Sequence, residues 1–236
     1  MLRENKKASY INTILKVLRS FLIYCVDEGY LQFDFLKFKW LKEEKVIIQT
    51  FTNMQAKQLI SFYRKNDYNS VKNKTIIMTL FETGIRCYEL CCLRLDDVQS
   101  GYLIIHGKNH KQRVVPLTPI LEKQFVIYKR VREKYFDCKV FQREYFFLSR
   151  TGRQLTNSAI EHIVKCAGEG IDRVRVSPHT LRHFYAQAQL KNGLDIYSLS
   201  RLLGHENISI TQRYLQGLRD KEILNSALST STILNL

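Results

Sequence analysis

The chain has 236 residues, of which 45% are hydrophobic, so it can bury one substantial core and carry a small additional unit. It contains 37 Lys and Arg against 22 Asp and Glu, a formal charge of +15 at pH 7. This charge favours a polyanionic partner, and nucleic acid is the leading candidate. The polar, basic start lacks a secretory signal, and no uninterrupted run of about 18 apolar residues follows. We therefore expect a cytoplasmic protein without membrane contact, and a nucleic-acid partner would make it nucleoid-associated.

The six cysteines do not have the spacing of a metal site. Three are isolated in the sequence, and Cys87, Cys91 and Cys92 lack a second ligand pair at the spacing that zinc sites use. We expect reduced, buried thiols. Neither a metal ion nor a cofactor is expected.

A helix is expected near the beginning of the chain. Apolar residues recur at helical spacing between Ser9 and Gly29, and this glycine can end the helix. After a charged segment, Thr52 and Gln55 form a Ser/Thr-x-x-Glu/Gln helix start. We place a domain boundary near residue 48, which separates a short N-terminal helical arm (1–48) from a main domain (49–236).

The next part of the chain predicts two helices and a hairpin. Residues 71–83 are expected to form a buried helix that Gly84 ends, and a new helix begins at once with Ile85 and Arg86. Two short β-rich segments, 101–106 and 113–117, flank a polar turn that contains Lys108. This pattern is typical of a β-hairpin, with Lys108 at its tip or on the adjoining strand.

Ser177 and Pro178 mark the start of another helix, because serine caps free amides and proline suits the first turn. His179 and Arg182 are three residues apart and share one face of this helix. Both lie near its positive end, where exposed backbone amides favour a phosphate.

Two further helices are expected before the tail. One begins at Asp195 and ends at Gly204, and Ser209 starts the helix that carries Tyr214. His205 stands immediately after the glycine. The predicted fold class is therefore mainly α with a small antiparallel β-sheet.

Six residues of these segments suit the cleavage and rejoining of a DNA phosphodiester: Arg86, Lys108, His179, Arg182, His205 and Tyr214. Two arginines can hold phosphate oxygens bidentately and stabilise the charge of the transition state. A tyrosine that attacks phosphorus conserves the ester bond, so the strand can be resealed without a nucleotide cofactor. The lysine can protonate the departing 5′ oxygen, while the histidines can donate to the phosphate or exchange protons with the phenol.

Other polar residues receive supporting or structural roles. Glu89, three residues after Arg86, is expected to orient that guanidinium. His183, one turn after His179, is a candidate supporting residue. His106 and His162 are expected to be structural.

The segments TGIRCYEL, HTLRH and LLGH, with a tyrosine nine residues after the last, resemble the signatures of the tyrosine recombinase (phage integrase) family. The resemblance covers about 170 residues, from Thr52 to roughly Asp220. It implies a catalytic domain that cleaves DNA through a 3′-phosphotyrosyl intermediate, with Tyr214 as nucleophile and the other five residues as the activating set. It further implies site-specific recombination, as in the integration, excision or transposition of a mobile element, without a metal ion.

The family resemblance also suggests an assembly. It implies double-stranded DNA as the partner and a homotetramer on paired DNA sites, with accessory DNA-bending or directionality proteins as further partners. The arm would be a short or truncated form of the four-helix domain with which family members clamp DNA. The tail beyond Gly217 is expected to form an amphipathic helix that packs on its own domain or on a neighbouring subunit. The sequence also departs from the family pattern at Asn109, where glycine is common.

Two alternative functions remain open at this point. A type IB topoisomerase would use the same tyrosine attack to relax supercoils without exchanging strands. A non-catalytic regulator would use residues 195–216 as a helix-turn-helix, with Tyr214 as a core or phosphate-contacting phenol. The regulator leaves Arg86 and the HTLRH segment without a role.

Overall fold

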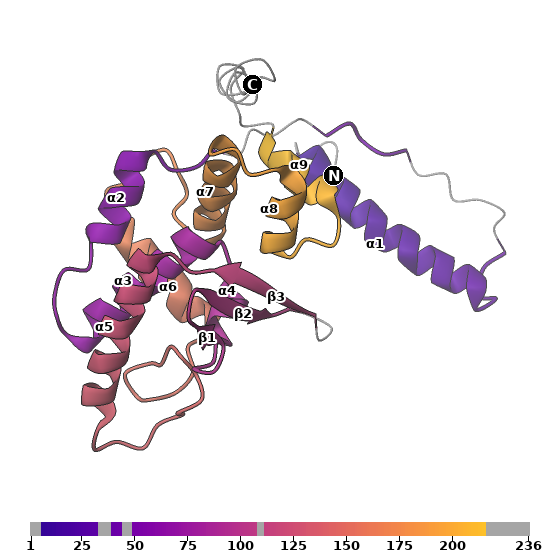
Figure 1. Cartoon of the computed structure of the whole chain (residues 1–236). Helices are drawn as coiled ribbons and strands as arrows, with labels where there is room; N and C mark the ends of the chain where they lie inside the picture. Colours follow the sequence, from indigo (N-terminus) through magenta and orange to yellow (C-terminus); the bar gives the residue numbers. More distant parts are fainter. Residues whose placement is uncertain (1–5, 33–38, 44–48, 108–110, 216–236) are drawn as a thin grey trace, which may run out of the picture. The chain divides into compact units, whose positions relative to one another are not determined.

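The computed structural model describes residues 6–32, 39–43, 49–107 and 111–215 of the chain (Figure 1). The backbone divides into two compact units, Met1–Ile47 and Ile48–Leu236. The first contains the helix α1 (Ala8–Asp27), and the left-handed residue Gly29 follows it with a φ of 75°. This confirms the helix expected between Ser9 and Gly29.

A buried asparagine of α1, Asn12, forms hydrogen bonds with residues 41 and 43. The side-chain amide of Asn12 donates to the carbonyl oxygen of Leu41 and to a carboxylate oxygen of Glu43, both at 2.9 Å. The backbone N–H of Leu41 donates back to the Asn12 side chain at 2.9 Å. These bonds satisfy the buried amide and join residues 41 and 43 to α1.

Several apolar side chains of α1 are exposed. Val17 and Phe21 are 67% and 59% exposed, and Leu18 is 42% exposed. Among the described residues, α1 is the one helix whose length and composition would allow it to cross a membrane. Core helices of globular proteins can have the same length and composition.

The second unit is mainly helical. In chain order its described elements are α2 (Asn53–Ser61), α3 (Tyr68–Thr83), α4 (Cys87–Cys91), β1 (Val98–Gln99), β2 (Tyr102–His106), β3 (Gln112–Pro116), α5 (Pro119–Phe136), α6 (Asn157–Ala167), α7 (Pro178–Lys191), α8 (Ile196–Leu203) and α9 (Ile208–Leu215). This architecture confirms the predicted fold class.

Side-chain caps explain where several helices begin. Thr52 and Gln55 each accept the other's backbone N–H, which is the expected capping box. Ser177 caps α7 and Asp195 caps α8, as predicted. α3 begins at residue 68, before the expected residue 71, because the carboxylate of Asp67 accepts the first free backbone amides.

The three strands form an antiparallel sheet in the order β1-β2-β3. The register places Leu103 opposite Val115, and both side chains are fully buried. The predicted hairpin is therefore confirmed, and β1 adds a short edge that the sequence pattern did not indicate. Gly107 donates its N–H to the carbonyl oxygen of Lys111 at 2.7 Å at the base of the turn. Lys108 and Asn109 lie outside the described residues.

Two hydrophobic clusters hold the second unit together. The larger one surrounds α3, which packs on both α5 and α7, and buries Ile76, Ile77 and Leu80 completely. The smaller one joins α7, α8 and α9, which lie side by side in Figure 1. Its buried members are Tyr185, Ala186, Leu190, Leu199, Leu203 and Tyr214. Tyr214 is thus placed by apolar packing within this three-helix layer.

All six cysteines are free thiols. Cys25 and Cys91 are buried, but Cys138 is exposed and the other three are half-buried. The prediction of buried thiols is therefore wrong for four of the six cysteines. The exposed one, Cys138, lies in the segment after α5. Within the described ranges, His, Cys, Asp and Glu side chains do not gather in a group that could hold a metal ion.

Candidate active site

The C-terminal end of α8 is the point at which three arginines from different elements meet. Arg113 of β3, Arg182 of α7 and Arg86 before α4 donate in that order to the consecutive carbonyl oxygens of residues 202–204, at 2.7, 2.7 and 3.0 Å. The last carbonyls of a helix lack partners within the helix and form the negative end of its dipole. Three guanidinium groups are therefore fixed at one place by backbone oxygens.

Arg182 is the most deeply buried of the three, with 5% of its surface exposed. It also donates to the carbonyl oxygen of Gly84 at 2.6 Å and to Nε2 of His205 at 2.9 Å. Burial and the nearby charge of Arg86 lower the pKa of Arg182 to about 10. The guanidinium therefore stays cationic at neutral pH and supplies fixed positive charge to the site.

A single buried carboxylate, that of Glu89, connects two of these arginines. Arg113 donates to its two oxygens at 2.8 and 2.7 Å, and Arg86 donates its Nη1 at 3.0 Å and its backbone N–H at 2.7 Å. Burial alone would raise the pKa of Glu89, but the hydrogen bonds and charges of the two arginines lower it to about 2. Glu89 is therefore ionised and orients Arg86, as the sequence predicts.

His205 follows the end of α8 and uses both ring nitrogens. Nε2 accepts from Arg182, and Nδ1 lies 2.8 Å from the hydroxyl of Thr211 in α9. Burial and the nearby charges of Arg182, Arg86 and Arg113 lower the pKa of His205 to about 4. The imidazole is therefore neutral at physiological pH, and Nδ1 is the nitrogen that carries the proton.

Tyr214 is 4% exposed and belongs to the cluster formed by α7, α8 and α9. Its ring stacks at 15° on that of His205, with 6.4 Å between centroids. Its hydroxyl lies 3.2 Å from Nδ1 of His183, one residue after Arg182 on α7. The α9 helix begins at Ile208 rather than Ser209, because the side chain of Asn207 accepts the Ser209 N–H.

The structure brings together four of the six predicted site residues: Arg86, Arg182, His205 and Tyr214. His179 lies exposed on the first turn of α7, although it is close enough to His183 to affect its charge. Lys108 falls outside the described residues.

Sequence reasoning did not single out Arg113 and gave His183 only a supporting role. Arg113 could have been noticed as a cation in a β-rich segment two residues before the buried Val115, because a charge in such a place needs a buried partner.

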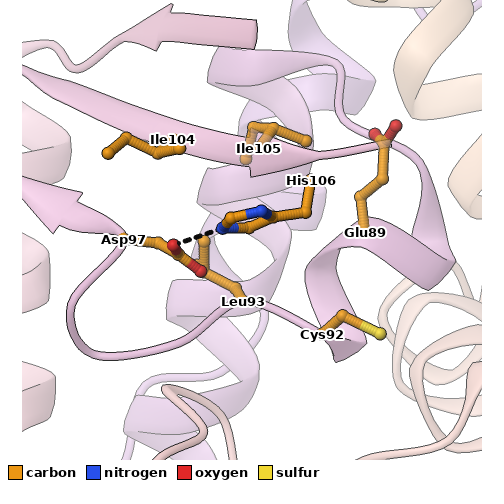
Figure 2. A pocket seen from close by; sticks show the side chains of 7 residues that line it. All are labelled: Glu89, Cys92, Leu93, Asp97, Ile104, Ile105 and His106. Atoms are coloured by element: carbon orange, nitrogen blue, oxygen red, sulfur yellow. Dashed lines mark hydrogen bonds and ion pairs between the residues drawn. The ribbon is translucent and has the colours of Figure 1, made fainter. Parts of the chain in front are cut away.

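The structural role expected for His106 has a visible basis. Nε2 of His106 lies 2.7 Å from the carboxylate of Asp97, which also accepts the backbone N–H of Arg94 at 2.9 Å. Figure 2 shows this pair in a small pocket between α4 and the sheet. The pocket is lined by Glu89, Cys92, Leu93, Asp97, Ile104, Ile105 and His106.

Comparisons with known proteins identify the family of the chain. The model of the phage integrase family matches residues 49–220. The tyrosine recombinase XerD of Listeria monocytogenes serotype 4b (strain F2365) is 30% identical over 221 residues, which cover 90% of this chain and 73% of that protein. XerD of Staphylococcus haemolyticus (strain JCSC1435) is 30% identical over 91% of this chain and 74% of its own length.

Solved structures show the same fold. The crystal structure of XerA recombinase superposes with a TM-score of 0.66 and 26% identity, over 80% of this chain and 65% of that chain. The Tn1549 transposon integrase, in complex with transposon right end DNA, gives a TM-score of 0.70 at 18% identity, over 98% and 82% of the two chains. Since the family model spans most of the sequence and the XerD proteins align over nine tenths of it, the chain belongs to the phage integrase family of tyrosine-type site-specific recombinases.

Proposed function

We propose that this chain cleaves and rejoins double-stranded DNA at specific sites through a 3′-phosphotyrosyl bond to Tyr214. The observation that carries the proposal is the convergence of Arg86, Arg182 and His205 at the end of α8, beside a buried phenol. A group of fixed cations next to one nucleophile suits attack on a phosphodiester, because both the substrate and the transition state are anionic.

The scissile phosphate would lie against the two guanidinium groups. Their remaining N–H donors can bind its non-bridging oxygens, while the carbonyls of α8 and the carboxylate of Glu89 keep both groups in place. By analogy with other phosphoryl-transfer sites, removal of one such arginine would slow the reaction by about 10³- to 10⁵-fold. Neutral His205 would donate from a ring nitrogen to the same phosphate once DNA replaces one of its present partners.

The chemical step exchanges one ester for another. The Tyr214 oxygen forms a bond to phosphorus, the bond between phosphorus and the 5′ oxygen breaks, and that oxygen takes a proton from Lys108. The reverse sequence reseals the strand, so neither a nucleotide nor a metal ion is needed for energy. His179, exposed on the first turn of α7, would add a donor to the phosphate.

We assign the remaining parts of the chain to DNA binding and assembly. The arm (1–48) would bind DNA as a short core-binding domain, and the region 49–236 would be the catalytic domain with its tail. Strand exchange requires paired sites, so we propose a homotetramer, together with accessory DNA-bending or directionality proteins. XerH in complex with its difH substrate shares the fold at 24% identity and a TM-score of 0.62. We place the reaction in the cytoplasm, on the DNA of a mobile element.

A covalent trapping assay tests the proposal. Duplexes that the protein binds are first selected from a random library, then rebuilt with a nick so that the 5′ product diffuses away. We expect a covalent protein–DNA adduct in the presence of EDTA, with none from Tyr214→Phe. If none of the bound duplexes gives an adduct, the proposal is wrong and DNA binding without chemistry, the regulator alternative, replaces it.

A second measurement separates recombination from relaxation. A recombinase joins strands from two partner sites and forms a tetramer on them, which native mass spectrometry of the DNA complex detects. A type IB topoisomerase would relax supercoiled plasmid and remain a monomer.

A further inference from the structure

The hydroxyl of Tyr214 lies 3.2 Å from Nδ1 of His183. The two rings are 5.3 Å apart between centroids and inclined at 56°. His183 is half-buried and Tyr214 is buried, so the contact is shielded from bulk water. A base for the phenol has to lie within hydrogen-bond reach of its proton, and His183 meets this requirement.

The other two histidines of the site are placed differently. His205 stacks on the Tyr214 ring, while its nitrogens bond to Arg182 and Thr211. His179 is exposed on the first turn of α7, one turn before His183. Geometry therefore separates the histidine that touches the phenol from those that flank it.

We propose that His183 is a catalytic residue that removes the proton of Tyr214 when the tyrosine attacks DNA. The inference rests on the proposed function of Tyr214. The phenolic proton moves from Oη to Nδ1 of His183, and the oxygen then forms its bond to phosphorus as the bond to the 5′ oxygen breaks. When the strand is resealed, His183 returns the proton to the departing phenol. The step requires a neutral imidazole whose proton is on Nε2.

The surroundings of His183 keep the imidazole neutral and ready to accept. Burial lowers its pKa, and electrostatic interactions with His179 and Arg182 on the same helix lower it further. Tyr214 faces it from α9, and the ring of His205, in the turn after α8, stacks on the same phenol. The fixed charge of Arg182, next to His183 in the chain, would also stabilise the phenolate as it forms.

The decisive experiment compares two leaving groups in single-turnover cleavage of a nicked duplex. One duplex has the natural 5′ oxygen, and the other has sulfur at that position, which leaves without a proton. His183→Asn keeps a hydrogen-bonding group near the phenol but cannot take up its proton. We expect it to slow cleavage of both duplexes by about 10²- to 10⁴-fold. Lys108→Ala should slow only the oxygen duplex, because its role is to protonate the leaving group.

The matched control is His162→Asn. His162 lies on α6 with its ring beside Cys166, and its substitution should leave the cleavage rate unchanged. If His183→Asn cleaves either duplex at the wild-type rate, or if sulfur restores its rate, His183 is not the base. Faster cleavage by His183→Asn would mean that the hydrogen bond from His183 holds the phenol in an unreactive state, and this result would equally overturn the inference. If the wild-type protein itself forms no adduct, the proposed function has failed instead.

The pH dependence of the wild-type cleavage rate tests the inference without a substitution at His183. The wild-type cleavage rate should rise tenfold per pH unit in a range below about pH 6.5, where a histidine with a lowered pKa gives up its proton. This range should persist in His179→Asn and in Lys108→Ala. Its loss in His179→Asn would identify His179 as the base and refute the proposal.

Discussion

The carboxylate of Glu89 and the guanidinium of Arg113 form two parallel hydrogen bonds of 2.7 and 2.8 Å, with side chains only 4% and 12% exposed. The pair connects α4 to β3, and Arg113 also reaches a carbonyl of α8. Because Glu89 bonds to Arg86 as well, the pair fixes a guanidinium that we propose binds phosphate. Removal of this single carboxylate would release both Arg113 of β3 and Arg86 from their anchor on α4.

Glu89→Gln should therefore lower the free energy of unfolding by about 3–5 kcal/mol, the usual result when one partner of a buried ion pair is lost. Urea denaturation followed by circular dichroism measures the change. Lys111→Met is the control, since Lys111 pairs with Glu206 at 2.7 Å but both side chains are largely exposed. The control should leave the midpoint unchanged, and an equal shift in both variants would contradict the special role of the buried pair.

The same carboxylate should give stability a characteristic dependence on acid pH. The pKa of Glu89 is about 2 in the folded chain, whereas an unfolded glutamate has a pKa of about 4.3. Its contribution is therefore complete above about pH 4.3 and is lost as the pH falls towards 2. Unfolding midpoints measured across this range should fall more steeply for the wild-type protein than for Glu89→Gln. Parallel curves would mean that the carboxylate is not held ionised.

Arg113 should not be replaceable by lysine. Its guanidinium bonds to both oxygens of Glu89 and to the carbonyl of Leu202, and one ammonium group cannot reproduce this fork. We expect Arg113→Lys to slow DNA cleavage by about 10- to 100-fold, or roughly 1.4–2.7 kcal/mol on the barrier. Guanidinium ions added to Arg113→Ala at low concentration should restore part of the rate. Equal responses to guanidinium and to ammonium would indicate a salt effect instead.

The parts of the fold that were predictable depend on neighbours in the chain. Thr52, Ser177 and Asp195 cap helices that begin next to them, and Gly84 and Gly204 end helices in the left-handed conformation. Such signals act over three or four residues, so they can be recognised without tertiary information.

The contacts that complete the site lack such local signals. Glu89 and Arg113 are 24 residues apart, and the carbonyls of 202–204 are backbone groups that every residue type carries. His179 and His183 are one turn apart on α7, so the sequence placed both near the site. Which of them faces Tyr214 is decided by the packing of α9 on α7.

His205 should make stability depend on pH in a second, higher range. Burial and nearby arginines lower its folded pKa to about 4, compared with about 6.5 when unfolded. The neutral form therefore stabilises the fold fully above about pH 6.5, and this contribution is lost as the pH falls towards 4. Thermal unfolding midpoints measured between these pH values should fall less steeply with decreasing pH for His205→Gln than for the wild-type protein. His183, whose pKa is also lowered, would account for part of the remaining slope.

Gly204→Ala should separate backbone strain from damage to the site. Gly204 has a φ of 65°, and an added Cβ would lie 2.9 Å from Nη1 of Arg113, so the substitution strains the backbone and displaces that guanidinium. Gly193→Ala is the matched control, because Gly193 has a φ of 91° but nothing within 4 Å of an added Cβ. Each alanine should destabilise the protein by about 1–2 kcal/mol through the left-handed conformation.

Only Gly204→Ala should also slow cleavage in the single-turnover assay, because Arg113 and the adjacent contact of Arg86 with the Gly204 carbonyl would both shift. Equal cleavage rates in the two glycine variants, at equal stability, would show that the end of α8 does not position the arginines. If Gly204→Ala cleaves more slowly than Gly193→Ala at equal stability, the lower rate comes from the displaced guanidinium groups, because backbone strain is common to both variants.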